Sequence, residues 1–275
     1  MLQTSLGFAT LPNVKGDYTM KDIFEATILY NKNLSSDLYD MLVYAPEEAS
    51  RAKAGQFISF FTNNPAVIMP RPLSLCGINQ EEGTLRIVYK ASGAGTKEIS
   101  TYKKGDKIKG IGPVGSSFRL DPSQKNVAIV GSGIGTPPLL ELCKKIKKET
   151  PDSKISVYLG FRSVDQIILE NDFKYYSENV IISTDDKSGN IISSLPKEKE
   201  FDIIYSCGPS SMLKSVARYA DDLDIKCFVS LEERMACSIG ACLVCVTKVH
   251  TEEGWTYKRS CCTGPIFNAK ELVWE

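Results

Sequence analysis

The chain has 275 residues, of which 43% are hydrophobic and 24% charged, and its 33 basic side chains balance 33 acidic ones. This length predicts about two compact domains plus a small module, and the neutral balance gives no electrostatic reason to expect a nucleic acid or an anionic membrane as partner. No apolar run is long enough to span a bilayer, and nine cysteines without a signal peptide predict a cytoplasmic protein with reduced thiols.

The first part of the chain predicts β-structure. Residues 1–19 precede any periodic pattern and are expected to be an N-terminal extension, so translation could begin at Met1 or at Met20. From residue 20 to about residue 122, short β-rich runs are separated by turn signals, as in 25–30, 56–61 and 85–89. Many short strands with polar turns predict an antiparallel β-barrel domain.

Two segments of this domain carry groups suited to binding phosphate. In Arg71-Pro-Leu-Ser74, the arginine and the serine could hold a diphosphate and the edge of a flavin ring. Gly93, Gly95 and Thr96 follow the strand that ends at Tyr89 and suit a nest of backbone amides around a second phosphate. Taken alone, the same residues also fit a surface arginine and an ordinary glycine turn.

The pattern changes over residues 123–228, where strands alternate with helices. An apolar run over 126–130 is followed by a glycine-rich loop and then by apolar residues at helical spacing, Leu139, Leu142, Cys143 and Ile146. Further strand-like runs at 155–159 and 201–205 predict a mostly parallel α/β sheet.

Two loops of this α/β domain are candidates for binding a pyridine nucleotide. The first contains Gly131, Gly133 and Gly135 between a strand and a helix, which directs free backbone N–H groups at a phosphate. It departs from G-x-G-x-x-G because its third glycine is one position early, and no acidic residue stands at the expected ribose position. The second loop, Cys207-Gly208-Pro209, also follows a strand, so both would lie at the carboxyl edge of the sheet.

The C-terminal module, residues 229–275, contains the most specific motif. Cys237, Cys242 and Cys245 have the spacing C-x4-C-x2-C, and Cys261 or Cys262 follows downstream. This is the plant-type spacing of a [2Fe–2S] cluster held by four thiolates, which transfers one electron at a time. The motif therefore predicts an electron carrier or a module of a redox enzyme.

Other interpretations of the cysteines fit less well. Structural zinc sites usually contain two close cysteine pairs or cysteine with histidine, and His250 is the sole histidine. A Rieske centre needs two histidines, and disulfides suit secreted proteins. Buried thiols without a ligand role remain the interpretation for Cys76, Cys143 and Cys227.

In combination, the motifs resemble a known family. The order Arg-Pro-x-Ser, Gly-x-Gly-Thr, Gly-x-Gly-x-Gly-x-Pro-Pro and Cys-Gly-Pro-x-x-Met is similar to that of ferredoxin-NADP-reductase-like flavoproteins, over residues 23 to about 225. The segment 230–245, with 261–267, is similar to the electron transfer subunits of NAD-linked (B-type) dihydroorotate dehydrogenase. This resemblance implies a FAD-binding barrel, an NAD-binding α/β domain and a [2Fe–2S] domain.

The resemblance also assigns residues by position. It implies cluster ligands at Cys237, Cys242, Cys245 and Cys261, with Cys261 preferred to Cys262 because the last ligand stands three residues before Gly-Pro. Ser238 occupies a place that is usually glycine, and Cys262 with Thr263 replaces a polar and an acidic residue, which leaves the fourth ligand ambiguous. FAD contacts are implied at Arg71, Pro72, Leu73, Ser74, Val88, Tyr89, Lys90, Gly95 and Thr96.

The activity that the resemblance implies is an electron relay. An FMN-containing partner subunit would oxidise dihydroorotate in pyrimidine synthesis, and electrons would pass through [2Fe–2S] and FAD to NAD, in a heterotetramer of two copies of each subunit. A subunit of an NAD(P)H–ferredoxin transhydrogenase, a sulfite reductase or a hydrogenase is the alternative within redox enzymes. A zinc-stapled binding module is the alternative outside them, and the sequence does not choose between NAD and NADP.

Overall fold

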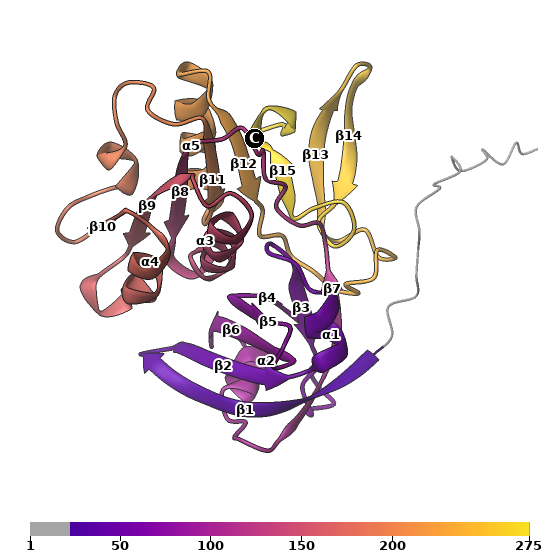
Figure 1. Cartoon of the computed structure of the whole chain (residues 1–275). Helices are drawn as coiled ribbons and strands as arrows, with labels where there is room; N and C mark the ends of the chain where they lie inside the picture. Colours follow the sequence, from indigo (N-terminus) through magenta and orange to yellow (C-terminus); the bar gives the residue numbers. More distant parts are fainter. Residues whose placement is uncertain (1–22, 275) are drawn as a thin grey trace, which may run out of the picture.

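The computed structural model describes residues 23–274. The predicted extension over residues 1–19, and the first three residues of the predicted barrel domain, lie outside that range. Figure 1 shows three parts: the β-rich N-terminal part, the α/β part, and a smaller C-terminal part that stands beside the α/β sheet and above β7 (Lys107–Val114).

The N-terminal part is a seven-stranded antiparallel sheet in the order β4-β3-β7-β1-β2-β6-β5. Side chains on β3 alternate between the two faces of the sheet. Ile58 and Phe60 are buried in the hydrophobic core of the β domain, and Phe57 lies on the opposite face, towards the C-terminal part. The remaining elements are β1 (Ile23–Ser35), β2 (Leu38–Tyr44), α1 (Pro46–Arg51), β3 (Phe57–Phe60), β4 (Arg71–Ser74), β5 (Gly77–Asn79), β6 (Thr84–Lys90) and α2 (Ala94–Ile99).

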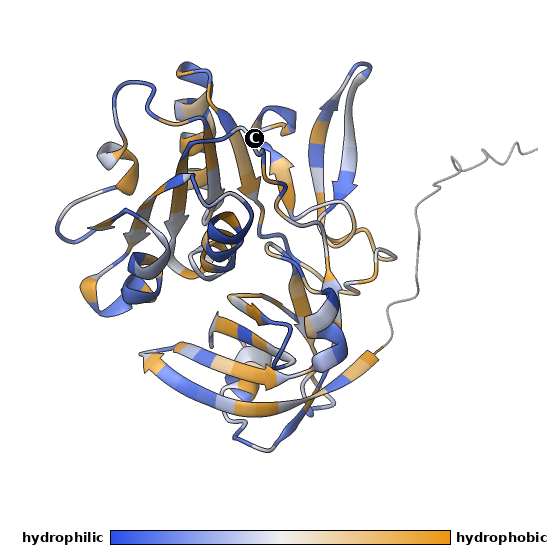
Figure 2. Cartoon of the chain, in the orientation of Figure 1, coloured by the Kyte–Doolittle hydropathy of each residue, from blue (hydrophilic) through white to orange (hydrophobic). Residues whose placement is uncertain are grey.

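The middle part is a sheet whose strands β10, β9, β8, β11 and β12 are parallel neighbours in that order. The central strands are its most hydrophobic segments in Figure 2, as strands covered on both faces must be. The elements are β8 (Asn126–Ser132), α3 (Pro137–Glu149), β9 (Lys154–Phe161), α4 (Glu170–Tyr176), β10 (Asn179–Thr184), β11 (Ile203–Cys207), α5 (Ser210–Asp222) and β12 (Lys226–Ser230), with short 3₁₀ turns at Gly133–Gly135, Val164–Gln166 and Ile191–Ser194.

Helix α3 forms where the apolar spacing predicts it. Its residues Leu139, Leu142, Cys143 and Ile146 are fully buried against the sheet, and two prolines occupy its first positions, where a missing N–H is harmless. The strand order reverses at β8, between β9 on one side and β11 on the other. The loops after β8 and β11 therefore flank the crevice in which open α/β sheets bind ligands.

The C-terminal part contains the hairpin β13 (Val246–Thr251) and β14 (Gly254–Arg259), followed by β15 (Ile266–Asn268) and a 3₁₀ turn at Ala269–Glu271. Strand β15 adds to the α/β sheet as an antiparallel neighbour of β12. The cysteine-rich segment, residues 231–245, lies between β12 and β13 and is thus anchored to the sheet at one end and to the hairpin at the other.

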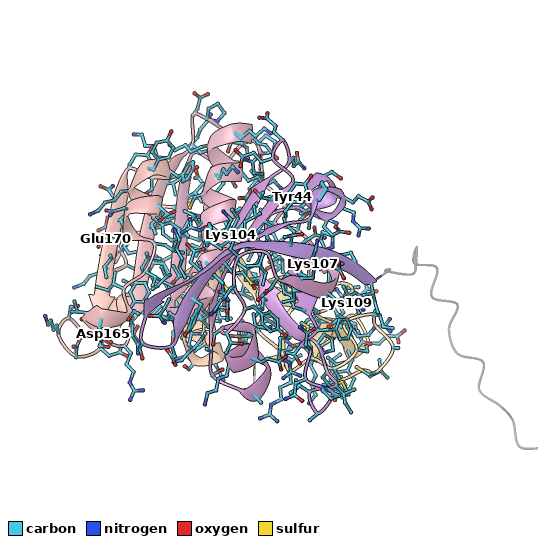
Figure 3. The ribbon with its side chains drawn as sticks, turned by 90° about the horizontal axis from the view of Figure 1, so that it is seen from below. Tyr44, Lys104, Lys107, Lys109, Asp165 and Glu170 are labelled. Atoms are coloured by element: carbon cyan, nitrogen blue, oxygen red, sulfur yellow. The ribbon has the colours of Figure 1, made fainter. Side chains whose placement is uncertain are left out.

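Polar contacts join the N-terminal β domain, which is called the barrel below, to the α/β part. Arg86 on β6 pairs with Asp40 at 2.9 Å within the barrel and with Asp172 on α4 at 2.6 Å. The Ser35 hydroxyl on β1 donates to the backbone carbonyl of Asp165. Figure 3 shows Asp165 and Glu170 on the α/β part, and Lys104, Lys107 and Lys109 on the barrel. These contacts fix the relative position of the two parts.

The predicted fold class is confirmed: an antiparallel β domain, a parallel α/β domain and a small cysteine-bearing module. Within residues 23–274, no helix has the length and apolar character needed to cross a membrane, since the longest two, α3 and α5, have 13 residues each.

Candidate flavin, nucleotide and iron–sulfur sites

The two barrel segments that the sequence predicts to bind phosphate lie side by side. The Arg71 guanidinium donates to the Met69 carbonyl through Nη2 at 2.7 Å and Nε at 3.2 Å. The stem of Arg71 packs against Gly95, where a Cβ atom would approach Arg71 Cδ to 2.9 Å. The absence of a side chain at Gly95 leaves room for the arginine stem at the start of α2. The expected glycine turn is the first turn of this helix, in which Gly93 N–H donates to Thr96 Oγ1 at 3.2 Å.

The other residues predicted to contact FAD differ in whether their side chains are buried or exposed. The Tyr89 side chain is buried in the barrel and donates to Asn31 Oδ1 at 3.1 Å, and Val88 is buried as well. Contacts from these two residues would therefore use the backbone. Lys90 is exposed and pairs with Asp37 at 3.4 Å. Pro72 and Leu73 form the middle of β4, where Pro72 is paired with Ser59 of β3.

The two predicted nucleotide loops touch each other. Gly131 lies within β8, Gly133–Gly135 forms the 3₁₀ turn before α3, and Cys207 ends the neighbouring strand β11. A Cβ atom on Gly135 would approach the Cys207 carbonyl and Gly208 Cα to 2.6 Å, so only glycine fits there. On Gly133, with φ +52°, a Cβ atom would meet nothing within 4 Å, so the turn is open on its outer side.

A small cavity lies where the three parts of the chain meet. Its volume is about 90 Å³. It brings together Ser74 of β4, Gly135 and Cys207, which are residues from three separate sequence motifs. The other lining residues are Phe57, Pro72, Ile134, Ser230, Leu231, Glu232, Glu233, Met235 and Pro265.

Sequence reasoning did not identify the acidic wall of this cavity. Glu232 and Glu233 are the second and third residues after β12, and burial raises the pKa of both carboxyl groups. The signal available in the sequence was a pair of glutamates at the carboxyl end of a parallel strand. Pro209, in contrast, was predicted but caps α5 outside the cavity wall.

The cysteine loop has a backbone arranged around sulfur. Ser238, Gly240 and Leu243 have positive φ angles of 58°, 84° and 58°. The Cys242 N–H lies 3.4 Å from Cys237 Sγ. Burial raises the pKa of Cys237, but N–H groups of Ile239, Cys242 and Ala241 outweigh it and lower the pKa to about 7. Such amide nests stabilise thiolates and are typical of iron–sulfur sites.

The other two predicted ligands lie on the barrel side of the module. Cys245 and Cys261 are 3% and 2% exposed and pack with Phe57, Ile111 and Val114 of the barrel. Burial, and then the neighbouring Cys245 thiol, raise the pKa of Cys261. The half-buried Cys262 has its Sγ 3.7 Å from that of Cys261.

The four predicted ligands are all thiols, which is the donor set of a plant-type [2Fe–2S] cluster, in which four thiolates are spread over two irons. Cys237 Sγ lies beside the Cys242 N–H, and the thiols of Cys245 and Cys261 are neighbours. Within residues 23–274, no three histidine, cysteine or acidic side chains are grouped closely enough to hold a metal ion.

Fold and sites together define a reductase-like protein with a C-terminal iron–sulfur domain, and the comparisons agree. Residues 232–273 match the family "Iron-sulfur cluster binding domain of dihydroorotate dehydrogenase B". A solved NADH-dependent reduced ferredoxin-NADP oxidoreductase, described in work on flavin-based electron bifurcation, is 27% identical with a TM-score of 0.81 over 90% of both chains. Phthalate dioxygenase reductase shares the fold, with a TM-score of 0.61 and 17% identity over 83% of this chain and 87% of its own.

Curated relatives narrow the class to one family. Dihydroorotate dehydrogenase B (NAD(+)), electron transfer subunit, from Clostridium perfringens is 36% identical over 255 residues, covering 91% of this chain and 98% of that protein. The protein of the same name from a Geobacillus species is 34% identical, covering 90% and 98%. The chain belongs to the family of electron transfer subunits of NAD-dependent dihydroorotate dehydrogenase B.

Proposed function

We propose that this chain transfers electrons between a dihydroorotate-oxidising partner subunit and NAD in pyrimidine synthesis, in the cytoplasm. The proposal assigns FAD to the barrel, a [2Fe–2S] cluster to the cysteine loop and the nicotinamide to the α/β loops. When bound, the cluster exchanges single electrons, and FAD exchanges them for the hydride of the nicotinamide.

The observation that carries the proposal is the position of Phe57. This single side chain lines the cavity at the junction of the three parts and belongs to the same buried cluster as Cys245 and Cys261. A flavin ring edge at Ser74 and a cluster held by these cysteines would therefore be separated by little more than one side chain. Short separation is what electron transfer between two centres requires.

The chain's own residues divide the work between binding and positioning. Arg71 with Gly95 and Thr96 would hold the diphosphate of FAD, and Pro72, Leu73 and Ser74 with the backbone of Val88, Tyr89 and Lys90 would hold its ring system. Gly131, Gly133 and Gly135 would bind the nucleotide on one side of the crevice, and Cys207, Gly208 and Pro209 on the other.

The cluster ligands that we propose are Cys237, Cys242, Cys245 and Cys261. The choice of Cys261 is supported by its burial beside Cys245, whereas Cys262 is half-buried. The exposed apolar side chains Ile239, Leu243 and Val244 lie on the same loop and would face the partner, which we propose contains FMN and assembles as two copies with two of this chain.

Co-purification with a candidate FMN subunit tests the function. The assembled pair, loaded with iron, FMN and FAD, is expected to reduce NAD when dihydroorotate is added. The complex with Cys245→Ser in this chain is the matched control, because it should still oxidise dihydroorotate with an artificial acceptor at the FMN subunit while NAD reduction is lost. A fully loaded wild-type pair that leaves NAD unreduced would refute the proposal.

A further inference from the structure

A buried hydrogen bond connects the barrel directly to the cysteine loop. The hydroxyl of Ser59, on β3, donates to the hydroxyl oxygen of Ser238 at 2.7 Å. Both side chains are removed from solvent, with 0% and 2% of their surfaces exposed. Ser238 follows Cys237 directly, so the bond ends one residue from a proposed cluster ligand.

The backbone at Ser238 is in a conformation that serine does not favour. Its φ angle is +58°, in the left-handed region that glycine adopts without penalty. The serine hydroxyl must therefore contribute something that compensates for the unfavourable backbone. The Ser238 hydroxyl accepts the hydrogen bond from Ser59. Without this acceptor, the Ser59 hydroxyl would be a buried donor without a partner.

The strand that provides Ser59 also forms the wall between the proposed flavin and cluster sites. On β3, Phe57 and Ser59 share one face, because side chains alternate and the intervening Ile58 points into the barrel core. Phe57 lines the cavity and shares a buried cluster with Cys245 and Cys261. One face of a single strand thus supports the cluster module at both the Cys245 side and the Cys237 side.

The opposite side of the loop is held from within the C-terminal module. The Arg259 guanidinium donates to the Gly240 carbonyl at 2.5 Å. Ile239, Leu243 and Val244 leave the outer surface of the loop exposed by 49%, 61% and 47%. The contact between Ser59 and Ser238 is a polar link that ties the first part of the loop to the barrel.

We propose that Ser59 and Ser238 are positioning residues for electron transfer: their hydrogen bond fixes Cys237 relative to the flavin cavity and thereby sets the rate at which electrons pass between flavin and cluster. This inference rests on the proposed function. With FAD and the cluster bound, the hydride of one NADH would supply the two electrons that the flavin and the cluster share. The hydrogen bond would affect the transfer between flavin and cluster and not the hydride transfer from NADH, since the proposed nicotinamide loops lie on other elements.

The test compares Ser59→Ala, Ser238→Gly and the double variant with wild type, each containing its full complement of iron and FAD. Rapid mixing with NADH under anaerobic conditions resolves flavin reduction from cluster reduction by their absorption spectra, and the signal of the reduced cluster is recorded by electron paramagnetic resonance. Ser153→Ala is the matched control, because it removes another buried serine hydroxyl, which donates to the Gln124 carbonyl at 2.9 Å at the far end of β9.

We expect each single variant to reduce its cluster about tenfold more slowly while flavin reduction keeps its wild-type rate, because small misplacements of reacting groups have large effects on rate. The double variant should be no slower than the slower single variant, since both substitutions remove one contact. Ser153→Ala should lower the melting temperature without changing either rate.

Three results would overturn the inference: cluster reduction within twofold of wild type in both single variants, an equal slowing of flavin reduction, or an equal slowing in Ser153→Ala. Absence of iron and acid-labile sulfide from the wild-type protein would overturn the proposed function as well. A full complement of both cofactors with unchanged rates would overturn only the role of Ser59 and Ser238.

Discussion

Substituting Gly135 by alanine tests the contact between the two nucleotide loops. The new Cβ atom would lie 2.6 Å from three backbone atoms, the carbonyl carbon and oxygen of Cys207 and Cα of Gly208. Ordinary contacts begin near 3.4 Å, so the loops must separate by about 0.8 Å. The atoms that the new Cβ atom would meet are backbone atoms at the end of β11, which cannot move aside as the end of a flexible side chain would.

The expected cost follows from this overlap. Forcing an extra methyl group into packed structure typically costs about 1–3 kcal/mol, and each kcal/mol lowers Tm by about 2–4 °C in a protein of this size. Displacing one wall of the proposed nicotinamide site by nearly 1 Å should also reduce NADH oxidation, with ferricyanide as acceptor, by about tenfold or more. FAD content should be unchanged, because the barrel contacts are untouched.

Gly105→Ala is the control for this experiment. Gly105 has φ +94° in a barrel turn, and a Cβ atom there would meet nothing within 4 Å. The substitution should lower Tm by a few degrees through backbone strain, about 1 kcal/mol, and leave NADH oxidation at its wild-type rate. Wild-type NADH oxidation in Gly135→Ala, or an equal loss in Gly105→Ala, would refute the argument that the two loops are held in contact by a missing side chain.

Three further predictions concern other parts of the molecule. Cys245→Ser should abolish the visible absorption of the cluster and leave bound FAD in place; loss of FAD and of folded structure together would indicate a structural metal instead. Asp40→Asn should destabilise the protein by about 3 kcal/mol, because it leaves the half-buried Arg86 without its bidentate partner. Asp172→Asn should cost about 1 kcal/mol, since the pair of Arg86 with Asp172 is more exposed. Equal costs of the two substitutions in urea unfolding would contradict this reasoning. Burial raises the pKa of Glu232, so the neutral carboxyl stabilises the fold at low pH, and this contribution is lost as the pH rises through the raised pKa. The free energy of unfolding of Glu232→Gln should therefore exceed that of wild type by an amount that grows with pH. A difference that does not depend on pH would count against this prediction.

Local patterns in the chain were sufficient to predict several elements. The spacing of Leu139, Leu142, Cys143 and Ile146 predicted the buried face of α3, because helix periodicity depends only on residues a few positions apart. The C-x4-C-x2-C spacing placed three predicted ligands on one short segment, and this segment is a loop with positive φ angles at Ser238, Gly240 and Leu243. The segment from Gly93 to Thr96, for which the sequence allowed an amide nest or an ordinary glycine turn, is the first turn of α2.

Residues that matter through distant contacts could not be predicted in this way. Phe57 and Ser59 look like ordinary members of a β-strand, and Glu232 and Glu233 look like surface charges. Their roles appear only when β3, β4, the loops after β8 and β11 and the cysteine loop are brought together.

By itself, the sequence determined the class of each part: a β domain, a parallel α/β domain and a cysteine module, because each depends on spacing along the chain. The tertiary structure decided which faces meet, and in particular that one face of β3 touches both the cavity and the cysteine loop. Such meetings depend on strand order and on packing between residues that are more than a hundred positions apart, which no local pattern records.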